Sequence, residues 1–202
     1  MSNRLAKASA AFGKLRANVW DRSGLKTTTK IKVYRAIVIP TLLYACETWT
    51  VYSRHAKKLN HFHMNCLRNL LKIKWRDKIP DSEVLTRANL PSIFTLLQKA
   101  QVRWAGHIVR MSDERIPKQL LYGELSKGKP HAGGQMKRFK DSLKVSLKSL
   151  SIEVNSWEPL AKNRPDWRGS ITSGARLAEK RRKTEAQIKR ALRKDKENRT
   201  QA

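Results

Sequence analysis

The stretch SRHAKKLNHFHMNCLRNLL, residues 53–71, carries the clearest helical pattern in the chain. Its apolar side chains recur every three or four residues, at Leu59, Phe62, Cys66, Leu67, Leu70 and Leu71. This spacing places them on one face of an α-helix. Ser53 is a suitable N-cap, because its hydroxyl oxygen can accept from a first-turn backbone N–H. The stretch therefore predicts an amphipathic helix that ends near Lys74.

The sequence before this stretch also predicts helices. Residues 5–20 show the same apolar spacing, and a second helical segment runs from about residue 28 to residue 39. Pro40 then predicts a kink, or a new helix with proline in its first turn, that continues to Trp49. Residues 37–45 also fit a buried strand, because Ile, Val and Tyr favour strands. We favour the helix.

Residues after the stretch continue the helical pattern. Asp81 is placed to cap a short helix that ends at Ala88, and Pro91 or Ser92 opens a long helix through Met111. The predicted inward face of that long helix consists of Ile93, Leu96, Leu97, Ala100, Trp104, Ile108 and Met111. A later helix places Met136, Phe139, Leu143, Leu147 and Leu150 inward, and a short capped turn follows at residues 156–161. The fold class predicted is all-α, a bundle of amphipathic helices with short loops.

Composition changes divide the chain into segments. The glycine-rich, basic run GELSKGKPHAGG is the best candidate boundary, and apolar residues become sparse after Ile171. The predicted segments are a thumb-like helical segment at 1–52, a helical core at 53–122, a linker at 123–134, a helical subdomain at 135–170 and a basic tail at 171–202. We expect the tail to be a solvated helix, or a segment that orders only on a partner.

Charge indicates the class of partner. The chain has 202 residues, with 44 Lys and Arg against 16 Asp and Glu, and a formal net charge of +28. Such an excess favours binding to nucleic acid. No apolar run approaches the ~20 residues that cross a bilayer, and no signal-peptide pattern follows Met1, so we expect a nuclear or cytoplasmic protein that is not secreted.

Basic side chains form two rows at helical spacing, which identifies the candidate binding residues. Lys99, Arg103 and Arg110 fall on one line of the long helix, with Gly106 between them, where a polyanion backbone could approach closely. The second row, in the later helix, consists of Lys137, Arg138, Lys140, Lys144 and Lys148. A charged face is often merely solvated, but two rows with few acidic residues opposite favour contact with phosphates.

Other chemistry is poorly supported. Cys46, His63, Cys66 and His107 are conceivable zinc ligands. Their spacing does not resemble the close ligand pairs of structural zinc sites. We interpret the two cysteines as small apolar core residues of a protein that resides in a reducing compartment. No nucleophile motif or phosphate loop occurs, and Asp113 and Glu114 are better explained by ion pairing. We expect no cofactor.

The tryptophans have two interpretations. Trp104 lies in the predicted inward stripe, whereas Trp49, Trp75, Trp157 and Trp167 lie near helix ends or turns. There they could pack between helices or stack on bases. We favour packing for all of them.

Several blocks, in their order along the chain, resemble one known family. They are KIKVYRAIVIPTLLYACETW from Lys30, LNHFHMNCLRNLLKIKWRDKIPDSEVL from Leu59, RWAGHIVRMSDERIPKQLLYGEL from Arg103, GGQMKRFKDSLK from Gly133 and WEPLAKNRPDWR from Trp157. Together they resemble the C-terminal region of reverse transcriptases encoded by non-LTR (LINE-type) retrotransposons, over about Ser2 to Arg168. The resemblance implies a helical thumb followed by a domain that handles template RNA and target DNA.

The chain departs from that family where catalysis is concerned. The resemblance implies palm-domain aspartates that hold two metal ions, usually as an Asp-Asp pair, and this sequence contains no such pair. No endonuclease-like segment precedes the thumb-like one, and Met1 directly before it suggests a truncated reading frame or remnant copy. The tail beyond Ser170 is extra to the resemblance. We therefore expect no enzymatic activity.

Two hypotheses from different classes follow. In the first, the chain is a non-catalytic fragment of a retrotransposon RNA-directed DNA polymerase that binds RNA or DNA through backbone contacts. In the second, it is a structural or protein-interaction module that docks its apolar faces on the remaining polymerase domains or another protein, while its charge serves solubility and localisation.

Overall fold

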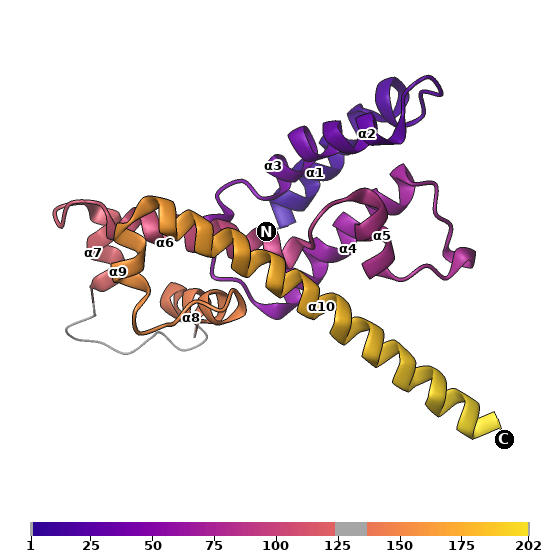
Figure 1. The fold of residues 1–202 in the computed structure, drawn as a ribbon. Coiled ribbons are helices and arrows are strands. Elements are labelled where there is room, and N and C mark those ends of the chain that lie inside the picture. The colour runs from indigo at the N-terminus through magenta and orange to yellow at the C-terminus, as the bar shows by residue number, and fades with distance from the viewer. Residues whose placement is uncertain (1, 124–136, 202) are drawn as a thin grey trace, which may run out of the picture.

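The computed structural model describes residues 2–123 and 137–201, and within these ranges it is helical and contains no strand. The predicted all-α class is therefore confirmed. None of the described helices is long and apolar enough to cross a membrane. The elements are α1 (Ser2–Lys14), η1 (Arg16–Trp20), α2 (Thr27–Val33), η2 (Tyr34–Val38), α3 (Ile39–Leu42), η3 (Cys46–Thr48), α4 (Ser53–Leu70), η4 (Trp75–Asp77), α5 (Asp81–Ala88), α6 (Ile93–Val109), α7 (Ile116–Tyr122), α8 (Phe139–Ser149), α9 (Trp157–Lys162) and α10 (Arg164–Gln201) (Figure 1).

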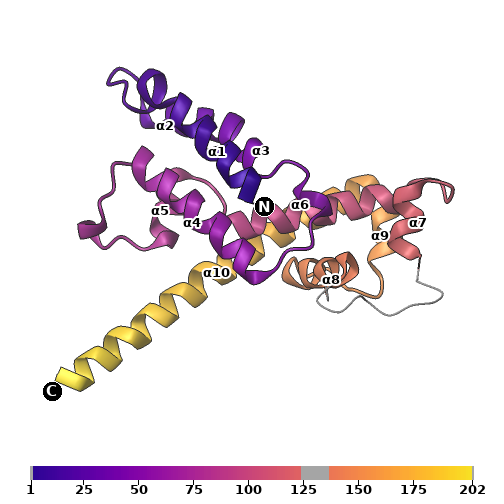
Figure 2. The same cartoon turned by 180° about the vertical axis from the view of Figure 1, so that it is seen from behind.

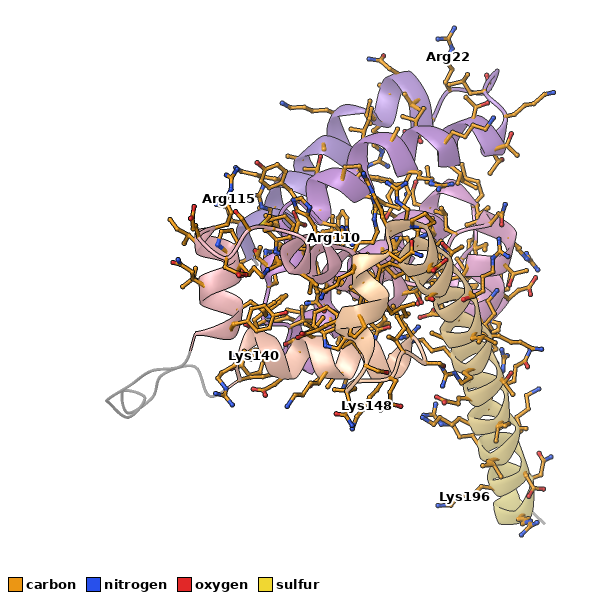
Figure 3. All side chains as sticks on the ribbon, turned by 60° about the vertical axis from the view of Figure 1, so that its left-hand side comes forward. Arg22, Arg110, Arg115, Lys140, Lys148 and Lys196 are labelled. Atoms are coloured by element: carbon orange, nitrogen blue, oxygen red, sulfur yellow. The ribbon has the colours of Figure 1, made fainter. Side chains whose placement is uncertain are left out.

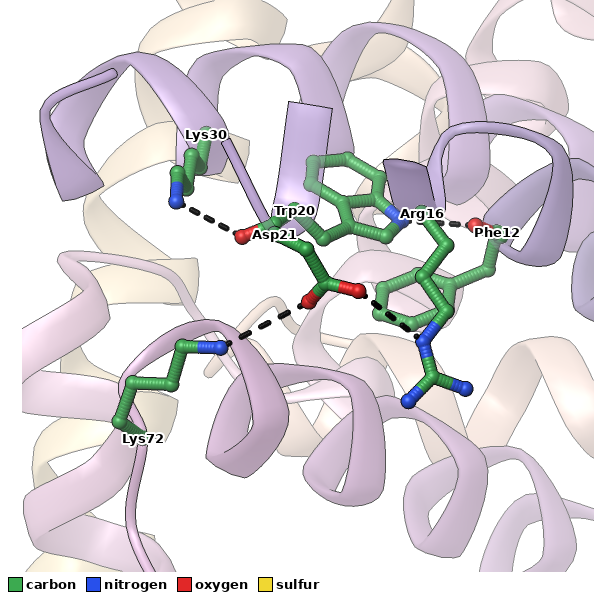
Figure 4. Close-up of polar contacts among 6 residues, drawn as sticks. All are labelled: Phe12, Arg16, Trp20, Asp21, Lys30 and Lys72. Atoms are coloured by element: carbon green, nitrogen blue, oxygen red, sulfur yellow. Dashed lines mark hydrogen bonds and ion pairs between the residues drawn. The ribbon is translucent and has the colours of Figure 1, made fainter. Parts of the chain in front are cut away.

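The N-terminal helices form a hairpin around aromatic side chains. Trp20 is buried, stacks on the Phe12 ring at a centroid distance of 5.0 Å, and donates its indole N–H to the Phe12 carbonyl at 2.7 Å. Lys30 donates to the Trp20 carbonyl at 2.7 Å, and Asp21 pairs with Arg16 at 3.2 Å (Figure 4). These contacts fix the turn between α1 and α2.

The apolar segment around Pro40 is helical, so the alternative of a buried strand is wrong. A π-helical turn, η2, leads directly into the short α3, and Pro40 lies in the first turn of α3. Proline's fixed φ of about −65° suits this helical position. The helix ends at Leu42, earlier than the predicted Trp49, and Ala45 takes a left-handed conformation with φ 59° before η3.

Two helix caps differ from the prediction. Tyr52 is the N-cap of α4 and Ser53 is its first helical residue, without a side-chain capping bond. Pro80 likewise precedes α5, and Asp81 forms an ion pair with Arg68 at 2.7 Å instead of capping. In contrast, Ser92 does cap α6, since its hydroxyl accepts from the Thr95 N–H.

Helix α6 is the central element. It contacts η3, α4, α7, α8, α9 and α10, and Figure 2 shows it in the middle of the molecule. Its N-terminal half, with Ile93 and Leu97, joins the apolar cluster of α1–α5, whereas Val102, Ala105 and Val109 join a second cluster with α8, α9 and α10. Because helices surround α6, the predicted single inward stripe was too narrow: Gln101 and Gly106 are buried as well.

Helix α10 runs without interruption from Arg164 to Gln201. Its first half packs through Trp167, Ile171, Ala175 and Ala178, all buried in the second cluster. Its second half projects away from the molecule (Figure 1). The helix thus crosses the predicted boundary at residue 170. The linker beyond Gly123 and the predicted core residue Met136 lie outside the described residues.

Candidate nucleic-acid interface

The antiparallel crossing of α6 and α10 carries a strongly basic surface. At one end Trp167 packs against Gly106, whose missing side chain makes room for the indole. At the other end the Glu179 carboxylate accepts from the Ser92 hydroxyl at 2.8 Å and from the Thr95 hydroxyl at 2.6 Å. These two contacts set the register of the two helices.

Arg182 strengthens the contact at the Glu179 end of the crossing. Arg182 donates to the Thr95 hydroxyl at 2.6 Å, to the Ser149 hydroxyl at 3.1 Å and to the Gln98 side chain. Burial lowers the pKa of this guanidinium, while the nearby Glu179 carboxylate opposes that shift. Arg182 therefore joins α10 to α6 and α8 and serves the fold.

The Gly106 end carries four arginines around a surface hollow of about 390 Å³. Arg103 and Arg110 come from α6 and its end, and Arg164 and Arg168 come from the first turns of α10. The pKa of Arg110 is lowered by burial and then by the charges of Arg164 and Arg168. Arg110 is thus close enough to Arg164 and Arg168 to be repelled by them, which favours an anionic partner at this end.

A second hollow of about 930 Å³ lies along the same two helices, toward the N-terminus of α6 and further along α10. Its basic side chains are Arg35, Lys99, Arg176, Lys180 and Lys183. We call the two hollows together the α6–α10 groove. It is lined by nine basic side chains and by two acidic ones, Glu47 and Glu179, of which Glu179 is engaged by Ser92 and Thr95.

The groove contains three of the predicted binding residues, Lys99, Arg103 and Arg110. The idea that a polyanion approaches at Gly106 is wrong, however. Gly106 is buried beneath Trp167, so the missing side chain serves helix packing and leaves no opening to solvent.

The predicted row on α8 lies outside this groove. Lys144 and Lys148 line a separate hollow with Glu153, and Lys140 borders an apolar hollow beside α7 (Figure 3). Lys137 donates its ammonium to the Val51 carbonyl at 3.2 Å, and Arg138 is the N-cap of α8, where it contacts Asp141. The two predicted rows therefore do not form one surface.

Sequence reasoning missed the contribution of α10. Arg164, Arg168, Arg176 and Lys180 recur at intervals of four or eight residues, which indicates a basic row that winds around the helix by about 40° for every four residues. The predicted boundary at residue 170 divides this row between a helical subdomain and a tail, which hides the signal.

The four candidate zinc ligands do not form one cluster. Cys46, His63 and Cys66 are buried, whereas His107 is exposed beside the groove arginines. Burial raises the pKa of both thiols to about 12, which opposes the thiolate form that binds zinc. Within residues 2–123 and 137–201, no three His, Cys, Asp or Glu side chains are grouped as metal ligands. Asp113 pairs with Lys118 at 2.7 Å, in line with the expected ion pairing.

The fold and the groove thus define a helical protein with a strongly basic interhelical surface. No family model matches the chain, and no solved structure matches it. The chain is similar to a putative uncharacterized transposon-derived protein of Caenorhabditis elegans, with 25% identity over 162 residues. The match covers 72% of this chain and 57% of the relative, so the chain spans less than two thirds of that protein's length.

Proposed function

We propose that this chain is a non-catalytic part of a transposon-encoded RNA-directed DNA polymerase of the non-LTR type, and that it binds RNA or DNA through phosphate contacts. The observation that carries the proposal is the α6–α10 groove, with nine basic and two acidic side chains on a rigid helical crossing. The family resemblance and the transposon-derived relative support the origin.

Groove dimensions suit an extended polyanion. From Arg164 to Lys183 the helix rises about 28 Å at ~1.5 Å per residue. A nucleic-acid strand carries one phosphate per step of about 3.4 Å. Several phosphates of one strand would therefore lie along this length of the groove. Contacts of this kind are insensitive to sequence and strongly sensitive to salt.

A salt titration tests the proposal. Binding of labelled single-stranded RNA, single-stranded DNA and duplex DNA is measured by fluorescence anisotropy between low and moderate NaCl. Replacing Arg164, Arg168 and Arg176 together by Gln should reduce the slope of log K against log salt by about 2, because each lost phosphate contact removes ~0.7 to 0.9.

The matched control removes the same charge from α8, by replacing Lys140, Lys144 and Lys148 with Gln. If only this control lowers the slope, the α8 row is the interface and the groove is not. If both triple variants lower the slope by the same small amount, binding reflects the net charge alone. No detectable binding of any nucleic acid by the wild-type chain at low salt contradicts the proposal.

The non-catalytic part of the proposal rests on the missing Asp-Asp pair. We expect no primer extension by the pure protein with template, magnesium and nucleotides, and measurable extension would refute it.

A second candidate function, a protein-interaction module, is favoured by an apolar hollow between α6, α7 and α8. Trp104, Ile108, Leu121 and Phe139 line it, and Leu120 at its edge is 76% exposed. Such a surface fits a docking helix or a neighbouring domain of the same polymerase. This candidate predicts that the Leu120→Arg variant loses binding to that neighbouring domain while nucleic-acid binding is unaffected.

A further inference from the structure

Trp75 is held outside the core on an ordered turn. Its side chain is 81% exposed, so the predicted packing role is wrong for this tryptophan. The turn is fixed by the Lys74 N–H, which donates to the Asp77 carboxylate at 2.8 Å, and by the left-handed Lys78, with φ 47°. The Arg76 guanidinium lies 5.7 Å from the indole centroid. The indole is therefore presented to solvent by a defined local structure.

The turn is also strongly basic. Lys72, Lys74, Arg76 and Lys78 surround Trp75 within seven residues, and Asp77 is the one acidic residue among them. The Asp77 carboxylate is committed to the Lys74 N–H, and Lys72 forms a pair with Asp21 at 3.7 Å. A single exposed apolar residue needs no explanation by itself, but an indole set among cations matches a partner that has both flat rings and negative charge.

Helix α10 connects this turn to the α6–α10 groove. Arg190 donates to the Lys78 carbonyl at 3.2 Å, and Lys183, at the end of the groove, donates to the Thr86 hydroxyl at 3.1 Å. Arg190 follows Lys183 by seven residues, or about 10 Å of helix. The turn that carries Trp75 thus lies just beyond the Lys183 end of the groove.

We propose that Trp75 is a stacking site for an unpaired base, and that this turn makes the chain selective for single-stranded RNA or DNA. The inference rests on the proposed function, because the backbone of the same strand would lie in the groove. Every base has a flat face that can stack on an indole, so the site tolerates any sequence. In a duplex the internal bases are already stacked on one another, which leaves Trp75 without a partner except at the ends.

The experiment compares the wild type with Trp75→Ala and Trp75→Phe. Each binds a 12-nucleotide single strand, a blunt duplex of the same sequence and phosphatidylserine vesicles at one fixed low salt concentration. We expect Trp75→Ala to weaken single-strand binding about tenfold, the typical effect of losing one base–aromatic stack. Trp75→Phe should retain much of the single-strand affinity, because a phenyl ring can also stack on a base. The duplex affinity of both variants should differ from that of the wild type by less than about twofold.

Tyr44→Ala is the matched control, because Tyr44 is another exposed aromatic residue, at 63%, and it lies in the turn between α3 and η3. It should leave single-strand binding unchanged. Because Trp75 is largely exposed, Trp75→Ala should keep the wild-type melting temperature. Acrylamide quenching gives a second measurement: in the wild type the single strand should protect the most accessible tryptophan, and this protection should be missing in Trp75→Phe.

Several results would overturn the inference while the proposed function stands. The inference fails if Trp75→Ala binds the single strand as tightly as the wild type, or if it loses single-strand and duplex binding equally. Loss of vesicle binding alone would make the turn a membrane contact instead. If the wild type binds no nucleic acid at all, the proposed function and this inference fail together.

Discussion

At the residue scale, the buried pair of Tyr34 and His63 shows how a polar group is accommodated in the core. The Tyr34 hydroxyl and His63 Nδ1 lie 2.9 Å apart, and both side chains are fully buried. Burial lowers the pKa of His63 to about 4 and raises that of Tyr34. His63 is therefore neutral at pH 7, so its role is structural, a polar link between η2 and α4.

This shift predicts how stability depends on pH. The unfolded chain takes up a proton on His63 near pH 6.5, whereas the folded chain resists protonation until about pH 4. Between these values the unfolded state binds more protons, so the free energy of unfolding falls as pH falls. The loss from this group should reach about 3 kcal/mol at pH 4, from ~1.36 kcal/mol per pKa unit. It is complete below that pH and absent above about pH 6.5.

Urea unfolding at several pH values, followed by circular dichroism, measures the effect. The His63→Gln variant keeps a polar side chain that does not titrate. Its stability should therefore fall less than that of the wild type between pH 6.5 and pH 4. Parallel curves for the two proteins would show that His63 contributes nothing to the pH dependence.

At the scale of elements, the crossing of α6 and α10 depends on one small residue. A methyl group at Gly106 would overlap Nε1 of Trp167, which is buried in the second apolar cluster. We predict that Gly106→Ala lowers the free energy of unfolding by about 1 to 3 kcal/mol, the usual range for overpacking a core. The gain in helix propensity from alanine, about 1 kcal/mol, offsets part of this.

Gly169→Ala is the control on α10, because nothing lies within 4 Å of an added Cβ there. This variant should be neutral or more stable, since alanine favours the helix. Thermal melts of both variants measure the difference. A Gly106→Ala protein as stable as Gly169→Ala would mean that the indole moves aside easily and that the crossing is not closely packed.

The elements differ in how far the sequence predicts them. The apolar stripes of α4 and the Ser92 cap of α6 are local patterns, and both helices lie where these patterns place them. The π-helical turn η2, which contacts α1, and the left-handed Ala45 before η3 have no clear local signal. The candidate interface shows the same difference. The basic row on α6 can be predicted from local spacing, but its pairing with basic residues of α10 depends on how the two helices cross.

At the scale of the whole molecule, the net charge of +28 opposes folding through self-repulsion. The described residues form seven ion pairs, among them Arg87–Glu83 and Arg199–Asp195, and most of these have a partner that is about half exposed or more. Exposed pairs contribute little to stability. Repulsion between the remaining cations should therefore dominate the response to salt.

We predict that salt affects the stability of this chain and its binding to nucleic acid with opposite sign. Raising NaCl from about 50 mM to 500 mM shortens the screening length from roughly 14 Å to 4 Å, so the melting temperature of the free chain should rise. At low salt, single-stranded RNA should also raise the melting temperature, because a ligand that binds only the folded state stabilises it. That gain should vanish at 500 mM NaCl as phosphate contacts weaken. Melts followed at 222 nm, with and without RNA, test both effects, and a melting temperature that falls with salt in the free chain would show that attractive pairs outweigh the repulsion.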